Sequence, residues 1–179
     1  MHLKNRFVEK PGKEKIKTPL PKVEELTHKV ERTLVIIKPE HVHLADKILE
    51  ELDNHGKRIK TAKIKAVPKK TIEQHYAMLK GKSVYGWLIT EFIDKPAVIA
   101  IYEGKGIIQK FVDITGVTDP PKASKESIRG KYGEDSLEKA ISEKRALANV
   151  IHRSTSAEEA EREINIWKQF LNGGYDAGK

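Results

Sequence analysis

The stretch that decides the fold is Asn149-Val150-Ile151-His152-Arg153-Ser154-Thr155-Ser156, followed at once by the segment from Ala157 to Trp167. Its first half is a short apolar run, typical of a buried strand, and it brings a histidine to a turn. Ser156 and Glu159 have the S-x-x-E spacing of a capping box, so we predict that a helix begins near Ala157. Apolar residues then recur at helical spacing, at Ala160, Ile164, Trp167 and Leu171. The segment therefore predicts a strand, a turn and an amphipathic helix in direct succession.

A carboxylate shares the apolar face of that predicted helix. Glu163 lies three residues after Ala160 and four before Trp167, so it can reach back toward His152. A histidine nucleophile needs such a partner, because its ring must be held in one orientation and one tautomer. A lone histidine at a strand end is more often a structural residue, and it is the surrounding residues that favour a catalytic role here.

Composition limits the class of protein without identifying a partner. The chain has 179 residues, enough for one domain with an appendage, and it contains no cysteine, which excludes disulfide and thiolate chemistry. No apolar run approaches the roughly 18 residues of a membrane span and no signal-peptide pattern is present, so we expect a cytoplasmic protein without a membrane partner. The net charge is +8. Residues 1–30 hold eight Lys or Arg and four Glu, so half of that charge lies in the N-terminal segment.

The rest of the chain alternates between strand-like and helix-like patterns. Strands are predicted at 34–37, 59–67, 97–102 and 148–151, and helices at 44–56, 71–81, 84–92, 107–114, 134–146 and from 157 onward. Residues 117–130 are predicted to form a long irregular loop, which in a compact domain usually has a function. This order contains the βαββαβ arrangement of a ferredoxin-like sandwich. Periodicity alone predicts only the α/β class.

Taken together, these residues resemble the nucleoside diphosphate kinase family, whose phosphorylated histidine lies in an N-x-I-H-x-S-x-S segment followed by an A-E-x-E-I-x-x-W helix. Further family blocks occur in the expected order: Glu31-Arg32-Thr33 to Lys38-Pro39, His75-Tyr76, Glu103-Gly104, Gly116 with Thr118-Asp119-Pro120, and Ile128-Arg129-Gly130. The resemblance covers about Glu31 to Trp167. It implies an α+β fold of the ferredoxin-like type, with helices packed on a four-stranded antiparallel sheet.

The resemblance also implies a reaction and a set of site residues. His152 would be the nucleophile of a ping-pong transfer of the γ-phosphate from a nucleoside triphosphate, such as ATP, to a nucleoside diphosphate. Glu163 and Ser154 would orient its ring. Mg²⁺ would be carried by the nucleotide, because no carboxylate cluster resembles a dedicated metal cage. The residues implied in nucleotide binding are Lys38, Tyr76, Val84, Thr118, Arg129 and Asn149. Neither a Walker loop nor a Gly-rich kinase loop is present, which agrees with phosphate binding by dispersed side chains.

The same comparison predicts the organisation of the chain. Residues 1–30 would form a basic, partly disordered extension, 31–172 the catalytic domain and 173–179 a short tail. The family forms dimers that build tetramers or hexamers, so we expect a homo-oligomer.

Several positions depart from the family pattern. Val112 stands where an arginine is usual before the loop, and Ala148 where the residue before the asparagine is often arginine. Val84 replaces the aromatic residue that stacks on the base, and Arg153 replaces a small residue. A short insertion also separates Arg129 from Asn149. If a cation compensates for Val112, Arg153 and Lys110 are the nearest candidates in sequence, and Arg153 is the better placed.

Two alternatives stay open at this point. One is a regulatory or weakly active nucleotide-binding relative, suggested by Val112, Ala148 and the basic extension. The other is a nucleic-acid-binding module, suggested by the charge and the fold class. Only 6% of the residues are aromatic and no strand carries an RNP1 pattern, which argues against nucleic acid as a partner.

Overall fold

The sheet of four strands is the centre of the computed structural model, which describes residues 30–171. Its strands are β1 (Val30–Ile37), β2 (Lys57–Ile64), β3 (Ala97–Lys105) and β4 (Ile151–Arg153). They are arranged in the order β2-β3-β1-β4, and every neighbouring pair is antiparallel. This confirms the predicted ferredoxin-like arrangement. The N-terminal extension and the C-terminal tail predicted from the sequence lie outside the described residues, apart from Val30, which begins β1.

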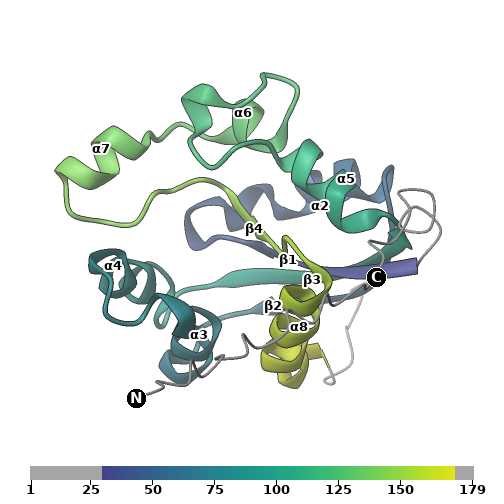
Figure 1. The fold of residues 1–179 in the computed structure, drawn as a ribbon, viewed down its shortest axis with the longest axis horizontal. Helices are drawn as coiled ribbons and strands as arrows, with labels where there is room; N and C mark the ends of the chain where they lie inside the picture. The colour runs from purple at the N-terminus through teal and green to yellow at the C-terminus, as the bar shows by residue number, and fades with distance from the viewer. Residues whose placement is uncertain (1–29, 172–179) are drawn as a thin grey trace, which may run out of the picture.

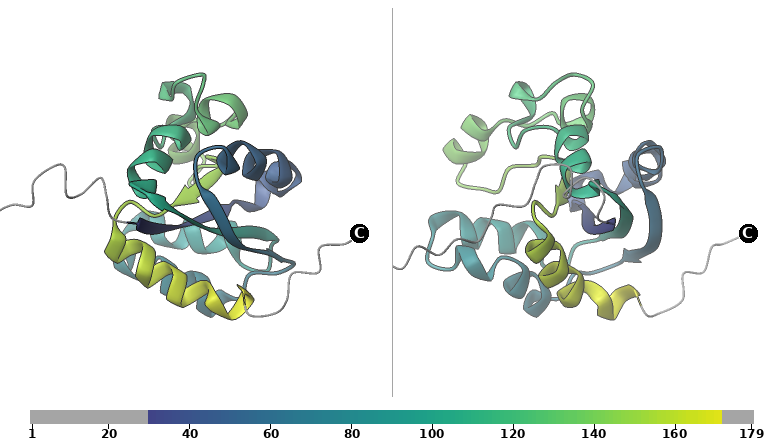
Figure 2. Two further views of the ribbon diagram at one scale, coloured as in Figure 1. Left: turned by 90° about the vertical axis from the view of Figure 1, so that its right-hand side faces the viewer. Right: turned by 45° about the vertical axis from the view of Figure 1, so that its right-hand side comes forward.

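Helices cover both faces of this sheet (Figure 1). Over one face lie α2 (Ala45–Asp53), α5 (Ile107–Thr115) and α6 (Ile128–Tyr132), and over the other lie α3 (Lys69–His75), α4 (Ser83–Phe92) and α8 (Ala157–Leu171). The turned views in Figure 2 show α8 and α2 on opposite sides of the strands. The remaining elements are η1 (Pro39–Leu44), η2 (Ala77–Leu79), η3 (Pro120–Lys122) and α7 (Leu137–Ser142).

The apolar run of β1 explains why the sheet lies between two helical layers. Side chains alternate along a strand, so Val35 and Ile37 face α2 and α5, whereas Leu34 and Ile36 face α8. All four are fully buried. Each such side chain contributes roughly 1.5–3 kcal/mol relative to an exposed one. A strand that is apolar on both faces is stable only between two layers.

Some predicted element bounds were wrong. The last strand covers Ile151–Arg153 rather than 148–151, so His152 is the middle residue of β4 and does not lie in the turn after it. The helix predicted over 134–146 is limited to α7, and the long loop contains η3 and the start of α6. The helix predicted to start at 71, with Thr71 as its cap, starts earlier: Pro68 precedes the first turn of α3, and Thr71 is buried inside that helix.

Candidate active site

A strained turn sets the position of His152. Val150 has a φ of 71°, and the amide N–H of Ile151 donates to the carbonyl oxygen of Asn149 at 2.8 Å, closing a tight turn around Val150. Positive φ is costly for a β-branched residue, and such strain is concentrated at functional sites. The amide N–H of Lys38 donates to the carbonyl oxygen of Val150 at 3.0 Å, which ties the turn to the end of β1. The strain explains why β4 begins only at Ile151.

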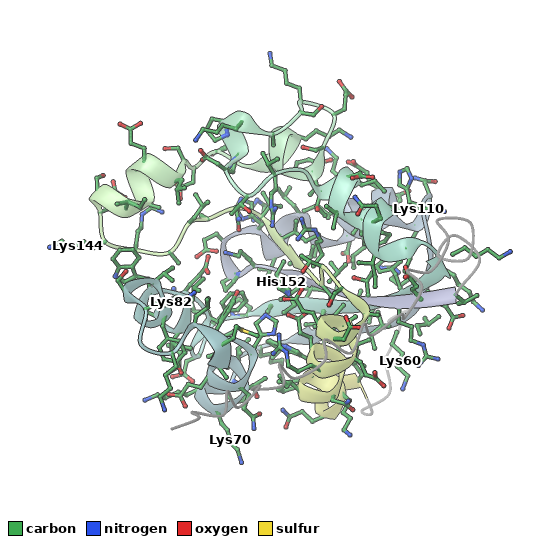
Figure 3. All side chains as sticks on the ribbon, in the orientation of Figure 1. Lys60, Lys70, Lys82, Lys110, Lys144 and His152 are labelled. Carbon is green, nitrogen blue, oxygen red and sulfur yellow. The ribbon has the colours of Figure 1, made fainter. Side chains whose placement is uncertain are left out.

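The side chain of His152 is held by two residues that follow it. Its Nε2 lies 3.0 Å from both carboxylate oxygens of Glu163, which projects from α8. The Ser154 hydroxyl donates to Glu163 Oε2 at 2.7 Å and accepts from the amide N–H of Leu34 at 3.2 Å. Glu163 is 1% exposed and the His152 side chain 18% exposed, so the ring is reached from one side only. Figure 3 shows His152 near the middle of the molecule, where α8 approaches the sheet.

A second histidine, which the sequence placed in a family block without a role, packs on this pair. The ring of His75 meets that of His152 edge to face with 4.5 Å between ring centroids, and its Nδ1 lies 3.7 Å from Glu163 Oε1. The indole N–H of Trp167 donates to His75 Nδ1 at 3.2 Å, so the neutral His75 carries its proton on Nε2. His75, His152 and Glu163 are the one group of potential metal ligands within residues 30–171. With its Nδ1 engaged by Trp167 and its Nε2 protonated, His75 has no free lone pair for a metal ion.

The electrostatic setting keeps His152 uncharged. Burial, together with the positive charges of Lys38, Arg153 and Arg129, lowers the pKa of His152 to about 3, against an opposing effect of Glu159. Burial likewise lowers the pKa of His75 to about 3. Both rings are therefore neutral at pH 7, and a neutral imidazole is the form that can act as a nucleophile.

Arg129 from α6 is bound to the backbone that surrounds the nucleophile. Its Nε donates to Asn149 O at 3.2 Å, its Nη1 to Gly116 O at 2.8 Å and its Nη2 to Ile151 O at 2.8 Å. The residue is 5% exposed, and burial together with the nearby Arg153 lowers its pKa to about 10. No carboxylate of the described residues forms an ion pair with it, so its positive charge is available to an anion.

Asn149 and Thr118 meet on the same side of the turn. The Asn149 side-chain amide donates to the carbonyl oxygen of Thr118 at 3.0 Å, and its buried Oδ1 has no hydrogen-bond partner among residues 30–171. A buried acceptor without a partner is rare, and this one lies beside the nucleophile's turn. Thr118 itself is exposed.

Lys38 is fully engaged, which the sequence did not predict. Its ammonium donates to both carboxylate oxygens of Glu91 at 2.9 and 3.0 Å and to the carbonyl oxygen of Leu147 at 2.9 Å. The two side chains are 5% and 4% exposed. An ammonium has three donors, and all three are used. Burial raises the pKa of Glu91 and the charge of Lys38 opposes this effect. No motif marked Glu91, because only the fold brings α4 to the end of β1.

Removing one partner of this buried pair should lower stability strongly, whereas replacing both partners should not. Glu91→Gln leaves a buried ammonium without its counter-charge, so we expect the free energy of unfolding in urea to fall by about 3–5 kcal/mol. Lys38→Met with Glu91→Leu removes both charges and should recover most of the loss. Glu73→Gln, which breaks the exposed pair of Lys69 and Glu73, is the matched control and should change stability by less than about 0.5 kcal/mol. A loss below about 1 kcal/mol for Glu91→Gln would contradict the interpretation.

The two remaining candidates, Tyr76 and Val84, lie on the helical hairpin that α3 and α4 form. Tyr76 is 8% exposed, and burial, with Glu91 and Glu163 nearby, raises its pKa well above the usual value. Its ring packs against that of His75. Val84 is half-buried in the first turn of α4. A cavity of about 730 Å³ lies beside this hairpin; Trp87, Glu91 and Ala148 are among its lining residues and His152 is not.

Comparison with known proteins shows which family this chain resembles in sequence. The model of the nucleoside diphosphate kinase family matches residues 31–170. The chain belongs to the nucleoside diphosphate kinase family. Among its relatives, the nucleoside diphosphate kinase of Thermococcus kodakarensis is 39% identical over 140 residues, which cover 77% of this chain and 76% of the relative. That of Saccharopolyspora erythraea is 36% identical over 140 residues, with 76% and 96% covered.

Solved nucleoside diphosphate kinases share the fold. A Borrelia burgdorferi nucleoside diphosphate kinase, described as a transition state mimic with bound vanadate and ADP, superposes with a TM-score of 0.73 at 25% identity, covering 82% of this chain and 94% of that one. A kinase from Pyrobaculum aerophilum gives a TM-score of 0.72 at 25% identity, with 80% and 99% covered. This chain is therefore a phosphotransferase, a nucleoside diphosphate kinase. Across residues 30–171, no helix is both long and apolar enough to cross a membrane.

Proposed function

We propose that this nucleoside diphosphate kinase works by a ping-pong mechanism in which His152 Nδ1 carries the phosphoryl group. The observation that supports this most directly is the contact of both Glu163 oxygens with Nε2. A carboxylate accepts from an N–H, so the proton lies on Nε2 and the lone pair on Nδ1. The neutral ring, held in one tautomer, is ready to attack phosphorus.

The two half-reactions use the same atom. In the first, Nδ1 attacks the γ-phosphorus of a nucleoside triphosphate, the P–N bond forms, and the bond from the γ-phosphorus to the bridging oxygen breaks with its electrons going to the departing diphosphate. In the second, a terminal phosphate oxygen of another nucleoside diphosphate attacks the phosphorus and the P–N bond breaks, returning the electron pair to Nδ1. Glu163 stabilises the positive charge on the phosphorylated ring through the Nε2–H. The rest of catalysis is the positioning of phosphates among cations.

The nucleotide-binding residues follow from the contacts around the turn. Arg129 supplies a buried charge close to His152, and Thr118 is bound to Asn149 at the turn. Tyr76 packs on His75, which in turn packs on His152. The unpartnered Asn149 Oδ1 suits a ribose hydroxyl, which is a hydrogen-bond donor. Val84 in α4 would contact the base by apolar packing without stacking. The vanadate and ADP of the Borrelia structure show a nucleotide and a phosphoryl mimic in a protein of this fold.

Mg²⁺ enters this proposal as part of the substrate. The buried carboxylates beside the site are already engaged: Glu163 by His152 and Ser154, and Glu91 by Lys38. These residues do not form an oxygen cage of the kind that Mg²⁺ prefers. We therefore propose that the ion arrives on the nucleotide phosphates and that no residue here holds it by itself.

A coupled exchange assay tests the mechanism. The full-length protein is incubated with γ-labelled ATP and Mg²⁺, freed of nucleotide and then mixed with a second diphosphate such as GDP. We expect a labelled protein that is acid-labile and base-stable, and complete transfer of the label to GDP. Transfer that occurs only when both nucleotides are present together would rule out the ping-pong route.

One observation favours a weakly active relative as the second candidate. The ammonium of Lys38, which the resemblance assigns to nucleotide contact, has no donor left unless it leaves Glu91. If that pair persists in the complex, nucleotide binding loses one cation. The rate in the exchange assay, compared with that of the Thermococcus kodakarensis relative, separates the two candidates.

The organisation expected from the sequence is part of the same proposal. We place the catalytic unit at 31–172, with basic residues 1–30 and the tail 173–179 outside it, which agrees with the family match to 31–170. The dimer-based homo-oligomer and the cytoplasmic location also remain proposals.

A further inference from the structure

Arg153 follows the nucleophile directly and points to the other face of the sheet. Its backbone pairs with Val35, and its Nε donates to the Thr115 hydroxyl at 3.1 Å, at the last residue of α5. That hydroxyl donates its own proton to the carbonyl oxygen of Phe111 at 2.6 Å, so a lone pair faces Arg153. The other four N–H donors of the guanidinium have no acceptor among residues 30–171. The side chain is therefore held at Nε and open at both Nη atoms.

The charge of Arg153 lacks a close counter-charge. No carboxylate in the described part of the chain lies within ion-pair distance of its guanidinium, although Glu159, Asp113 and Glu163 act on it from farther away. Another cation lies nearby, because Arg153 Nε donates to Thr115 and Arg129 Nη1 donates to the carbonyl oxygen of the next residue, Gly116. The charge of Arg153 also lowers the pKa of Arg129. Two partly buried guanidinium groups that repel each other are costly unless an anion lies between them.

The positions of the two arginines indicate which anion fits. Arg129 binds the carbonyl oxygens of Asn149 and Ile151, just before the nucleophile, and Arg153 comes just after it. Both charges also act on His152 itself, since each lowers the pKa of its ring. A guanidinium presents paired donors that match phosphate oxygens. The anion that must approach His152 in the proposed reaction is a phosphoryl group with its oxygens.

The helix to which Arg153 is tethered is the one that departs from the family pattern. Val112 lies three residues before Thr115 on α5, so the two side chains are neighbours on one helical face. The resemblance places an arginine at 112. Arg153 thus brings a guanidinium from β4 to the helical face where α5 carries a valine.

We propose that Arg153 is a second phosphate-binding residue of this active site, which binds the transferred phosphoryl group together with Arg129 and takes the place of the arginine absent at position 112. This rests on the proposed function, because it needs a phosphoryl group at His152.

The test is a substitution with a rescue. Arg153→Ala should lower kcat/KM of the exchange reaction by about 10- to 150-fold, the value of a hydrogen bond to a charged group. The rate of His152 phosphorylation by ATP in a single turnover should fall by a similar factor. Val112→Arg added to Arg153→Ala should recover at least tenfold of that loss. Arg153→Lys should be intermediate, because it keeps the charge and loses the paired donors.

Lys110 provides the matched control. It is exposed on α5, and Figure 3 shows it well away from His152, so Lys110→Ala removes the same charge from the same region without touching the site. Its rates should stay within about twofold of the wild type, a change of roughly 0.4 kcal/mol.

Each outcome decides one point. Wild-type protein that forms no phosphoenzyme would overturn the proposed function. Phosphorylation of the wild type that Arg153→Ala leaves within twofold would overturn the role of Arg153 alone. Arg153→Ala could lose both rate and melting temperature, with no recovery of the rate when Val112→Arg is added. That result would show a structural role for Arg153 and reject the proposal. If Arg153→Ala does not fold, Arg153→Lys is measured alone and together with Val112→Arg. A rate of His152 phosphorylation equal to that of the wild type in both variants would also reject the proposal.

Discussion

Replacing His152 with alanine should abolish formation of the labelled phosphoenzyme and lower exchange by roughly 10⁴-fold or more, the scale expected when a covalent nucleophile is removed. The reason is that no other side chain at this turn can take its place. The Ser154 hydroxyl donates its proton to Glu163. The side chains of Lys38 and Arg129 are positively charged hydrogen-bond donors and have no lone pair with which to attack phosphorus. Measurement consists of γ-labelled ATP incubation followed by acid and base treatment of the protein, together with steady-state exchange.

Exposed His55 supplies the control for this substitution. It lies just beyond the end of α2, away from the site, so His55→Ala should label as the wild type does. Acid stability separates the candidate acceptors, since phosphohistidine is lost in acid and phosphoserine survives it. Label that persists in His152→Ala, or that survives acid in the wild type, would show that the assignment is wrong. A thermal unfolding curve verifies that the variant is folded, because Glu163 loses a partner in it.

Sequence periodicity predicted the α/β class, and the resemblance to the family predicted the ferredoxin-like arrangement of the sheet. The apolar run at 34–37 predicted a strand within β1, and the capping residues predicted the start of α8 at Ala157. The Ser156 hydroxyl does accept from the amide N–H of Glu159, at 3.1 Å. The second half of the capping box differs, because the Glu159 carboxylate accepts from the amide N–H of Thr155, at 2.6 Å. Local signals thus located the helix end, and the neighbouring turn decided the detail.

The bounds of β4 could not be read from periodicity. The run from 148 to 151 is apolar and resembles a strand, yet a positive φ at Val150 delays the strand by three residues. Backbone strain of this kind is imposed by the surrounding contacts. Here these are the hydrogen bond from the Lys38 amide to Val150 O and the hydrogen bonds from the Arg129 side chain to Asn149 O and Ile151 O. Nothing in the local sequence reports those contacts.

The sequence could predict those contacts of the candidate site that join neighbouring elements, but not those that join distant ones. The contact of Glu163 with His152 is local, because the two lie on a strand, turn and helix that follow one another. The contact of Glu91 with Lys38 and the packing of His75 on His152 join elements far apart in the chain. Both require the helical hairpin to fold over the sheet, and no spacing rule predicts that. The roles of all these residues stay predictions until the variants are measured.

Glu163 should have the second largest effect, because it decides which ring nitrogen of His152 carries the proton. In Glu163→Gln the side-chain amide has one oxygen and one NH₂ group. Ser154 donates to Oε2 at 2.7 Å, so the amide oxygen takes the Oε2 position and the NH₂ group the Oε1 position. Both positions lie 3.0 Å from His152 Nε2, so the NH₂ group lies against the ring nitrogen as well as the oxygen. The NH₂ group donates only to an unprotonated Nε2, so it stabilises the tautomer that carries its proton on Nδ1 and has no nucleophilic lone pair there. The carboxylate of Glu163, with two acceptors and a negative charge, stabilises only the tautomer protonated on Nε2.

We therefore expect Glu163→Gln to lower the single-turnover rate of His152 phosphorylation by about 10²- to 10⁴-fold, the range seen when the residue that fixes a catalytic tautomer is replaced by its amide. The dissociation constant for ADP should stay within about twofold, a change of roughly 0.4 kcal/mol, since Glu163 is buried behind the ring and does not reach the nucleotide. Glu161→Gln, exposed on the same helix, should match the wild type in both measurements. Glu163→Asp keeps the carboxylate on a side chain shorter by one methylene, so its phosphorylation rate should lie between those of the wild type and Glu163→Gln. An ADP affinity that weakens in step with the phosphorylation rate would mean that Glu163 acts on nucleotide binding, and a normal rate in Glu163→Gln would mean that the tautomer of His152 is set by another group.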